Sequence, residues 1–168
     1  MRSPLLLLLL TAGASTALAQ SPLRVTSNAF APNGPIPTRY TCEGADVSPP
    51  LSWSQVPQGT QSIAILMDDP DAPKGTVTHW ILTNIPPETS ALRAGTPPPE
   101  GAIATMNDLG NRGYAGPCPP SGRHRYRFQV FALDTRIPRP ASRAELLSAI
   151  EGHVLAQGEL VGTYQKQR

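Results

Sequence analysis

The sequence is poor in charge, in cysteine and in long apolar runs. Only 15% of its 168 residues are charged, and the formal net charge is +2. So small a charge gives little electrostatic attraction to a polyanion, which argues against nucleic acid and anionic membranes as non-specific partners. No apolar run approaches the roughly 20 residues that a membrane-spanning helix needs, so we predict no transmembrane segment.

The signatures of nucleotide-binding enzymes and of common hydrolases are also missing. The chain has no G-x-G-x-x-G after a strand and no phosphate-binding loop that ends in Gly-Lys-Ser/Thr. It has neither a G-x-S-x-G elbow nor an H-E-x-x-H pair. We therefore predict no cofactor and no bound metal ion, and leave enzymatic activity open.

What the sequence does have is the pattern of an N-terminal export signal. Arg2 precedes the apolar run Leu5–Leu10, and Ala17-Leu18-Ala19 has the small-x-small form of a cleavage site. We predict a signal peptide over residues 1–19, cleaved after its last alanine, and export to the periplasm or out of the cell. Residues 20–168 then form one domain.

Proline is abundant, with 20 residues, and it limits where helices can form. The segments between prolines predict strands instead. Ser62–Met67 is a short apolar run that suits a strand buried on both faces, and Arg125–Phe131 alternates and is rich in aromatic and β-branched residues. Further strands are expected at Thr78–Ile85 and Glu159–Tyr164 and, from weaker patterns, at Leu23–Ser27, around Tyr40, at Leu51–Trp53 and at Ile103–Met106.

One helix is expected near the C-terminus. Ser142 and Glu145 have the spacing of a capping box, in which the hydroxyl pairs with a free amide and the carboxylate reaches back. Apolar residues then recur at helical spacing as far as Leu155, which predicts a helix over Arg143–Ala156. The fold class predicted from these elements is mostly β, with one good helix.

Candidate functional residues lie at the ends of the predicted strands. Asp69 and Asp71 occupy a proline-bracketed turn, His79 opens the next strand, and His124 opens the long strand that follows the Gly116–Gly122 loop. Rigid loops at strand ends are common places for convergent polar groups. Each residue alone also has a structural interpretation, because Asp before Pro forms turns and a strand histidine usually has a buried partner.

Six segments, in order, form a more specific combination. They are Ser48–Trp53, Asp69-Pro70-Asp71-Ala72-Pro73, His79-Trp80, Gly116–Gly122, His124-Arg125-Tyr126 and Gly158–Tyr164. Together they resemble the phosphatidylethanolamine-binding protein family, and more closely its bacterial Raf-kinase-inhibitor-like (YbhB/YbcL-type) branch. The resemblance extends from about Val25 to Tyr164. It implies a fold of two antiparallel sheets with a peripheral C-terminal helix.

The resemblance also implies a small cavity that binds anions such as phosphate and phospholipid head groups. Carried over residue by residue, the pocket would be formed by Asp69, Asp71, His79, Gly116, Pro117, His124 and Tyr126. The imidazole N–H groups, the tyrosine hydroxyl and loop amides near Gly116 would donate hydrogen bonds to the oxyanion. Asp69 would orient or help protonate an imidazole, or meet the ammonium of an ethanolamine-type head group.

Three functions remain open at this stage. The first is an exported module that binds small anions or lipid head groups, which the chemistry of the implied site favours. The second is an inhibitor of an unidentified protein partner, such as a protease or kinase, that acts through the pocket rim. The third is a phosphoester hydrolase in which Asp69, His79 and His124 hold a metal or act as acid and base.

The two cysteines, Cys42 and Cys118, predict a disulfide. An exported chain meets an oxidising compartment, the number of cysteines is even, and no C-x-x-C pair suggests a metal site. The alternative is that Cys118 is a thiolate nucleophile activated by His124. A bridge would hold the proline-rich loop before His124 and thereby preorganise the pocket.

Overall fold

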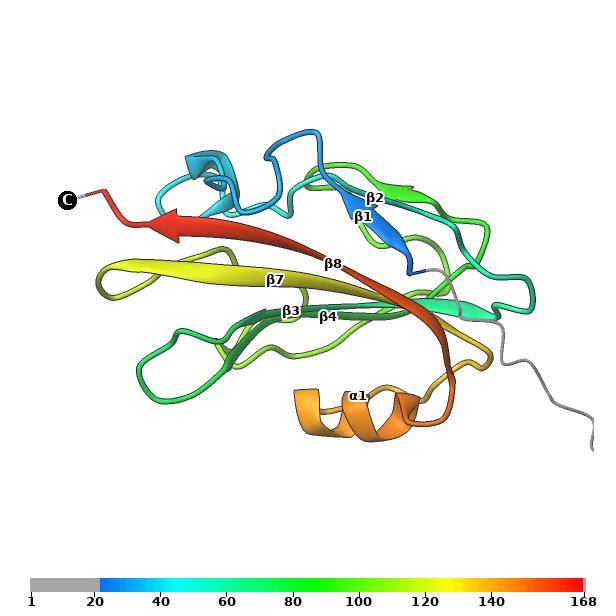
Figure 1. Ribbon diagram of the computed structural model, residues 1–168. Helices are drawn as coiled ribbons and strands as arrows, with labels where there is room; N and C mark the ends of the chain where they lie inside the picture. The colour runs from blue at the N-terminus through cyan, green and yellow to red at the C-terminus, as the bar shows by residue number, and fades with distance from the viewer. Residues whose placement is uncertain (1–21, 168) are drawn as a thin grey trace, which may run out of the picture.

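The computed structural model describes residues 22–167, so the predicted signal peptide and its cleavage site lie outside the described residues. Two antiparallel sheets lie face to face, and a helix covers the far side of the larger one (Figure 1). The smaller sheet has the strand order β1-β2-β5 and the larger the order β6-β4-β3-β7-β8. This is the fold class predicted from the sequence.

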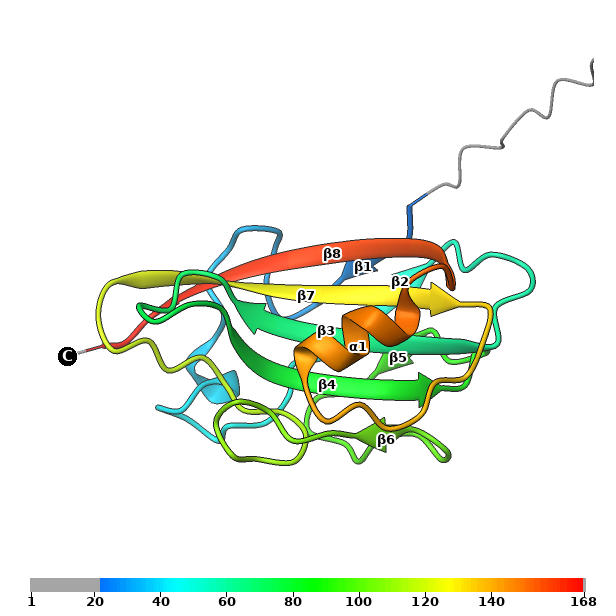
Figure 2. The ribbon, with the colours of Figure 1, turned by 90° about the horizontal axis from the view of Figure 1, so that it is seen from below.

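The helices and strands have the following bounds. The strands are β1 (Arg24–Thr26), β2 (Leu51–Ser54), β3 (Ser62–Asp69), β4 (Val77–Ile85), β5 (Ala91–Leu92), β6 (Ile103–Ala104), β7 (Arg123–Leu133) and β8 (Val154–Gln165). The helices are the 3-10 helix η1 (Thr38–Tyr40) and the α-helix α1 (Arg143–Ile150), which lies across the larger sheet in Figure 2. Over residues 22–167, no helix has the length and apolar character needed to cross a membrane.

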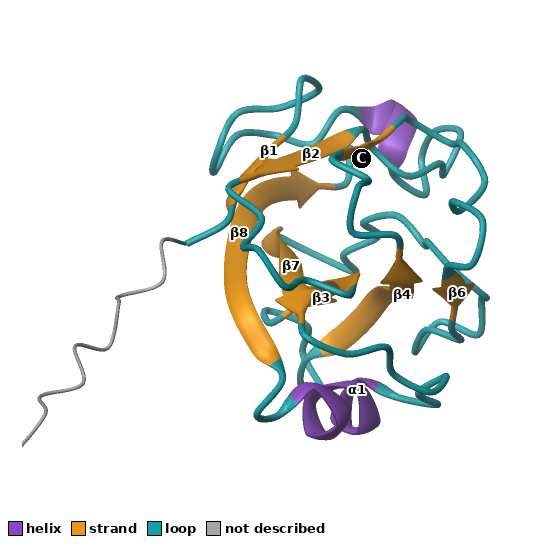
Figure 3. Ribbon diagram, turned by 90° about the vertical axis from the view of Figure 1, so that its right-hand side faces the viewer, coloured by secondary structure: helices purple, strands orange, loops and turns teal. Residues whose placement is uncertain are grey.

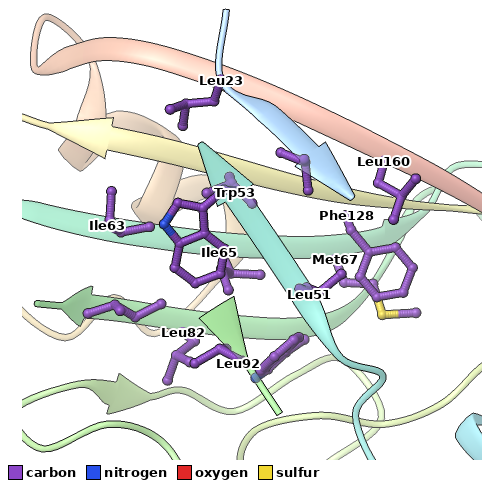
Figure 4. Packing of buried hydrophobic residues seen from close by; sticks show 14 of the residues in the cluster. Leu23, Leu51, Trp53, Ile63, Ile65, Met67, Leu82, Leu92, Phe128 and Leu160 are labelled. Carbon is purple, nitrogen blue, oxygen red and sulfur yellow. The ribbon is translucent and has the colours of Figure 1, made fainter. Parts of the chain in front are cut away.

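The larger sheet is the middle layer, with β1 and β2 on one side and α1 on the other (Figure 3). All eight residues of β3 are buried because both of its faces are covered. Ile65 belongs to the cluster between the two sheets together with Trp53 (Figure 4), whereas its neighbour Leu66 belongs to the cluster under the helix together with Leu146. The continuous apolar run of β3 is explained by this arrangement.

Two weaker strand predictions fail in whole or in part. The segment around Tyr40 is not a strand, since Thr38–Tyr40 forms a 3-10 helix in which the Tyr40 amide donates to the carbonyl of Pro37. One such turn has no periodicity to distinguish it from a short strand. Of Ile103–Met106 only the first two residues form β6, and Met106 makes an isolated bridge with Arg112.

The helix begins where the capping box predicts. The Ser142 hydroxyl accepts the amide of Glu145 at 3.2 Å. The Glu145 carboxylate reaches back to the amide of Ala141 at 2.7 Å rather than to that of Ser142. The start of α1 is therefore set by local side-chain chemistry.

The end of the helix was predicted wrongly. The helix ends at Ile150 instead of Ala156, because Gly152 takes a φ of +78°, which the chain needs in order to reverse. Val154 then begins β8, where it pairs with Leu133 of β7. The apolar residues beyond Ile150 fit helical spacing, but they belong to a strand whose partner is distant in sequence.

Candidate functional site

Three strands bring the candidate residues to one end of the larger sheet. The antiparallel pairing of β3 with β4 and β7 places the last residue of β3 beside the first residues of β4 and near the start of β7. In Figure 1 this is the end where β8 finishes at the C-terminus. Asp69 and His124, which are 55 positions apart in the sequence, meet there in a hydrogen bond.

A β-bulge in β4 turns His79 toward this site. The register with β3 shifts so that His79 has no partner of its own between Thr78 and Trp80. A bulge changes the direction of a side chain that regular alternation would place on the other face. The His79 ring meets the ring of Tyr126 edge to face, with centroids 5.3 Å apart and an interplanar angle of 89°.

The imidazole of His79 is buried and fixed by a backbone carbonyl. Its Nδ1 lies 2.8 Å from the oxygen of Ala115, and because that oxygen can only accept, Nδ1 carries a proton. Nε2 makes no hydrogen bond within residues 22–167 and is not sealed from solvent. Burial lowers the pKa of His79 below its ordinary value of 6.5, against the raising effects of the Ala115 and Gly116 backbone and of Asp69 and Asp46. A neutral His79 therefore presents an acceptor at Nε2.

Asp69 holds the second imidazole. Its Oδ2 accepts a hydrogen bond from Nδ1 of His124 at 2.7 Å, and its Oδ1 accepts the amide of Asp71 at 2.9 Å. Both partners of the first contact are buried, Asp69 to 3% exposure and His124 to 6%. Both carboxylate oxygens are thus occupied, and His124 has Nε2 as its remaining polar atom.

Tyr126 is fully buried beside these groups. Its hydroxyl has no hydrogen-bond partner within the described residues. Burial, and then the negative charge of Asp69, raise the pKa of Tyr126 far above its usual value, so the phenol keeps its proton. A buried hydroxyl without a partner is costly unless a water or a ligand pairs with it.

A cavity of about 300 Å³ opens at this end of the sheet. Asp69 and His79 form the buried polar part of its lining, and Lys74 adds a cation. The other lining residues are Ala72, Pro73, Val77, Leu109, Cys118, Pro119 and Pro120. The sequence does not single out Lys74, Leu109, Pro119 or Pro120 as pocket residues. Lys74 is one of only two lysines in the chain, the one signal that could have singled it out.

Two other cavities have fewer side chains that could take part in binding or catalysis. One of about 320 Å³ is formed by residues of β7 and β8, and one of about 450 Å³ lies between Asn33–Thr38 and the end of β8. Neither is lined by a histidine or by a buried carboxylate. The cavity that contains Asp69 and His79 is therefore the best candidate for a functional site.

Of the predicted pocket residues, Asp71, His124 and Tyr126 are not among those that line this cavity, although His124 bonds to Asp69 and Tyr126 contacts His79. The Asp71 carboxylate forms a two-point ion pair with the side chain of Arg125 at 2.7 and 2.9 Å and also accepts the Arg125 amide. The arginine lowers the pKa of Asp71 to about 2, against the raising effect of burial. Asp71 therefore has a structural role, because its ion pair with Arg125 connects the β3–β4 turn to the start of β7.

Gly116 and Pro117 precede Cys118, which lines the cavity, but do not line it themselves. The Gly116 amide donates to Oδ1 of Asp46 at 2.6 Å, so it is already occupied and not free for an anion. A Cβ at Gly116 would lie 2.5 Å from the carbonyl oxygen of Tyr40, which leaves room for glycine alone. Pro117 accepts the amide of Cys42 at 3.2 Å. These contacts fasten the loop to the segment that follows η1.

The predicted disulfide between Cys42 and Cys118 is confirmed. The two Cα atoms are 5.5 Å apart, and no cysteine of the described residues is free. Cys118 lines the cavity, so the bridge forms part of its wall. With its sulfur bonded, Cys118 is not the thiolate nucleophile of the alternative hypothesis.

The hypothesis of a metal site is not matched by the side-chain arrangement. Within residues 22–167, no group of three or more His, Cys, Asp or Glu side chains is placed so that it could hold a metal ion. Asp69, His79 and His124 come together, but each Asp69 oxygen already accepts a hydrogen bond.

Comparisons with known proteins give a consistent result. A family model described as phosphatidylethanolamine-binding protein matches residues 26–165. A UPF0098 protein of Methanothermobacter thermautotrophicus is 46% identical over 150 residues, which cover 86% of this chain and 99% of that protein. Protein PH1269 of Pyrococcus horikoshii is 48% identical over 151 residues, or 84% of this chain and 76% of that protein.

Two solved structures are similar over nearly their whole length. The homolog of phosphatidylethanolamine-binding protein CT736 from Chlamydia trachomatis has a TM-score of 0.81 at 39% identity, covering 87% of this chain and 99% of that one. YbcL of E. coli, described as a member of the mammalian PEBP family, has a TM-score of 0.81 at 35% identity, covering 88% of this chain and 100% of its own.

Proposed function

The chain belongs to the phosphatidylethanolamine-binding protein family, and we propose that it binds small oxyanions, such as phosphate or a phosphorylated head group, in the cavity beside Asp69 and His79. One observation carries the proposal: the Nδ1 atoms of His79 and His124 are both held by fixed acceptors. In each ring, Nε2 is then the only nitrogen that can form a hydrogen bond with a ligand. A protonated imidazole donates there, and such a charge-assisted hydrogen bond is the kind that oxyanions accept most strongly.

Other features of the cavity support the same chemistry. Lys74 adds a positive charge to the lining. The walls are mostly apolar, which lowers the local dielectric and strengthens any hydrogen bond formed inside. A volume of about 300 Å³ is at the small end of ligand sites and fits a head group rather than a whole lipid.

The proposal is binding without catalysis. Asp69 is committed to two hydrogen bonds, and Cys118 is committed to a disulfide. The groups that the hydrolase hypothesis needs as metal ligand or nucleophile therefore already have partners. Each of the two imidazoles retains a free nitrogen atom, and binding an anion requires only such hydrogen-bonding groups.

Replacement of His124 tests the proposal directly. We expect wild-type protein to bind sulfate saturably at pH 5.5 in calorimetric titrations, and His124→Ala to weaken this binding about tenfold to a hundredfold, the value of one hydrogen bond to a charged group. His153→Ala is the matched control, because His153 is also paired with a carboxylate, Asp134 at 2.8 Å, but is exposed and outside the cavity. Equal affinities of wild type and His124→Ala would contradict the proposal.

We also propose that the chain is exported. The disulfide supports this, because such bridges persist in oxidising compartments. When the full sequence is expressed in a bacterium, the intact mass of the protein recovered outside the cytoplasm should correspond to a chain that begins at Gln20. Recovery of the uncleaved chain, starting at Met1, from the cytoplasm alone would contradict the predicted signal peptide.

A further inference from the structure

The protonation state of His79 determines whether its free nitrogen, Nε2, accepts a hydrogen bond from a ligand or donates one to it. Nδ1 is fixed as a donor by the Ala115 carbonyl at 2.8 Å, so a neutral ring has Nε2 as an acceptor and a protonated ring has it as a donor. The ring is only 3% exposed and cannot be reoriented without losing the Ala115 bond and its contact with Tyr126. The ring therefore accepts from a ligand when it is neutral and donates to one when it is charged.

The groups that face His79 come from several parts of the fold. Asp69 at the end of β3 and Asp46 in the loop after η1 favour its charged form, and the buried Tyr126 of β7 is uncharged. Lys74 of the β3–β4 turn lines the same cavity and opposes a second positive charge. Burial is the largest effect and favours the neutral ring. Above pH 6.5 the acceptor form thus predominates.

From this geometry, and on the basis of the proposed oxyanion function, we propose that the pocket selects oxyanions that still carry a proton. At neutral pH a P–OH group of the ligand donates to Nε2 of His79, while the unprotonated oxygens accept from Lys74 and from His124 when that ring is charged. An oxyanion without a proton has no donor for Nε2 of the neutral ring, so the two acceptors face each other and no hydrogen bond forms. It binds well only after His79 itself takes up a proton.

Sulfate and inorganic phosphate are a matched pair for this proposal. At pH 8 both are mainly dianions of the same tetrahedral shape, but hydrogen phosphate has one proton and sulfate has none. Methyl phosphate is the third probe, because a phosphate monoester loses its second proton near pH 6. At pH 5.5 it is mainly a monoanion that carries a proton. At pH 8 it is a dianion without one. At pH 8 the charges of the three anions therefore differ little, and the proton is the variable.

Calorimetric titration of the wild-type protein with the three anions at pH 5.5 and pH 8 tests the inference. We expect all three to bind at pH 5.5, and inorganic phosphate to bind at least tenfold more tightly than sulfate and methyl phosphate at pH 8. Repeating the titrations in buffers of different ionisation enthalpy should show that sulfate binding near pH 7 takes up protons, whereas phosphate binding takes up fewer.

A variant separates the role of His79 from the general charge of the site. His79→Gln offers an amide N–H near the position of Nε2 at every pH, so the preference for phosphate over sulfate at pH 8 should fall to less than threefold. His153→Gln, at the exposed histidine outside the cavity, should leave the preference unchanged. If His79→Gln does not fold, the order of the three affinities in the wild-type protein at pH 8 decides whether the pocket selects oxyanions that carry a proton.

The outcomes distinguish the inference from the function on which it rests. If all three anions bind at pH 5.5 but sulfate equals phosphate at pH 8, selection by the ligand proton is wrong while anion binding stands. If none of the three binds at pH 5.5, the proposed function fails and the inference fails with it.

Discussion

Removal of the disulfide between Cys42 and Cys118 is expected to lower the free energy of unfolding by about 4–5 kcal/mol, the upper end for such a bridge. The two cysteines are 76 positions apart, and cross-linking so long a loop removes much conformational entropy from the unfolded chain. The bridge also holds a wall of the cavity, since Cys118 lines it. The Cys42→Ser/Cys118→Ser variant should therefore unfold at lower urea concentration and bind sulfate more weakly at pH 5.5.

Two controls accompany this measurement. Wild-type protein reduced by a dithiol should behave like the double variant in both assays, which shows that the bond and not the serines causes the effect. The unreduced, denatured wild type should have no titratable thiol and a mass about 2 Da below that of the reduced form, because forming the bond removes two hydrogens. Two free thiols in protein from an oxidising compartment, or unchanged stability after reduction, would contradict the account.

Sulfate affinity is expected to fall by about tenfold to a hundredfold between pH 5.5 and pH 8, because the charge-assisted hydrogen bond from His79 is lost when that ring becomes neutral. Sulfate stabilises the imidazolium form of His79, so it raises the pKa of His79 when it binds, and binding takes up protons. The affinity is greatest below the pKa of the free protein, which burial places under 6.5 for His79, and decreases as pH rises above it. Calorimetry or a thermal-shift titration in sulfate measures the profile.

Asp69→Asn is the matched variant for this profile. Its carbonyl oxygen still accepts the Asp71 amide, but its NH₂ faces Nδ1 of His124, where the carboxylate accepted before. Nδ1 then becomes an acceptor, and the proton of the neutral ring moves to Nε2, which can donate to sulfate at any pH. We expect a shallower profile and tighter sulfate binding at pH 8 than in wild type. A flat profile in the wild type would show that the imidazoles are not the anion donors.

Much of the fold is predictable because its long strands have local signals. The apolar run of β3 and the alternation of β7 reflect how many of their faces are covered, and the capping box fixes the start of α1. The end of α1 is not local. Val154 continues the helical spacing, yet it pairs with Leu133, and that tertiary contact decides its conformation.

The sequence predicts that several of the candidate residues lie near one another, but not how they are connected. Asp69 bonds to His124, and His79 contacts Tyr126. The sequence does not show, however, that a bulge turns His79 inward or that Asp71 pairs with Arg125 instead of facing the cavity. The hydrogen bond that occupies the Gly116 amide comes from Asp46, 70 positions away. Each of these features depends on which strands meet, and no local pattern specifies that.

The protonation of the two rings is the most direct test of the central claim, that His79 and His124 meet an anion through Nε2 because Nδ1 is engaged. Long-range ¹H–¹⁵N NMR spectra of the two imidazoles distinguish a protonated from an unprotonated ring nitrogen. The account predicts that His79 at pH 8, without anion, has its proton on Nδ1 alone, and that saturating sulfate at pH 5.5 leaves both nitrogens of both rings protonated with shifted Nε2 signals. A proton on Nε2 of His79 at pH 8, or Nε2 signals that sulfate does not move, would contradict it.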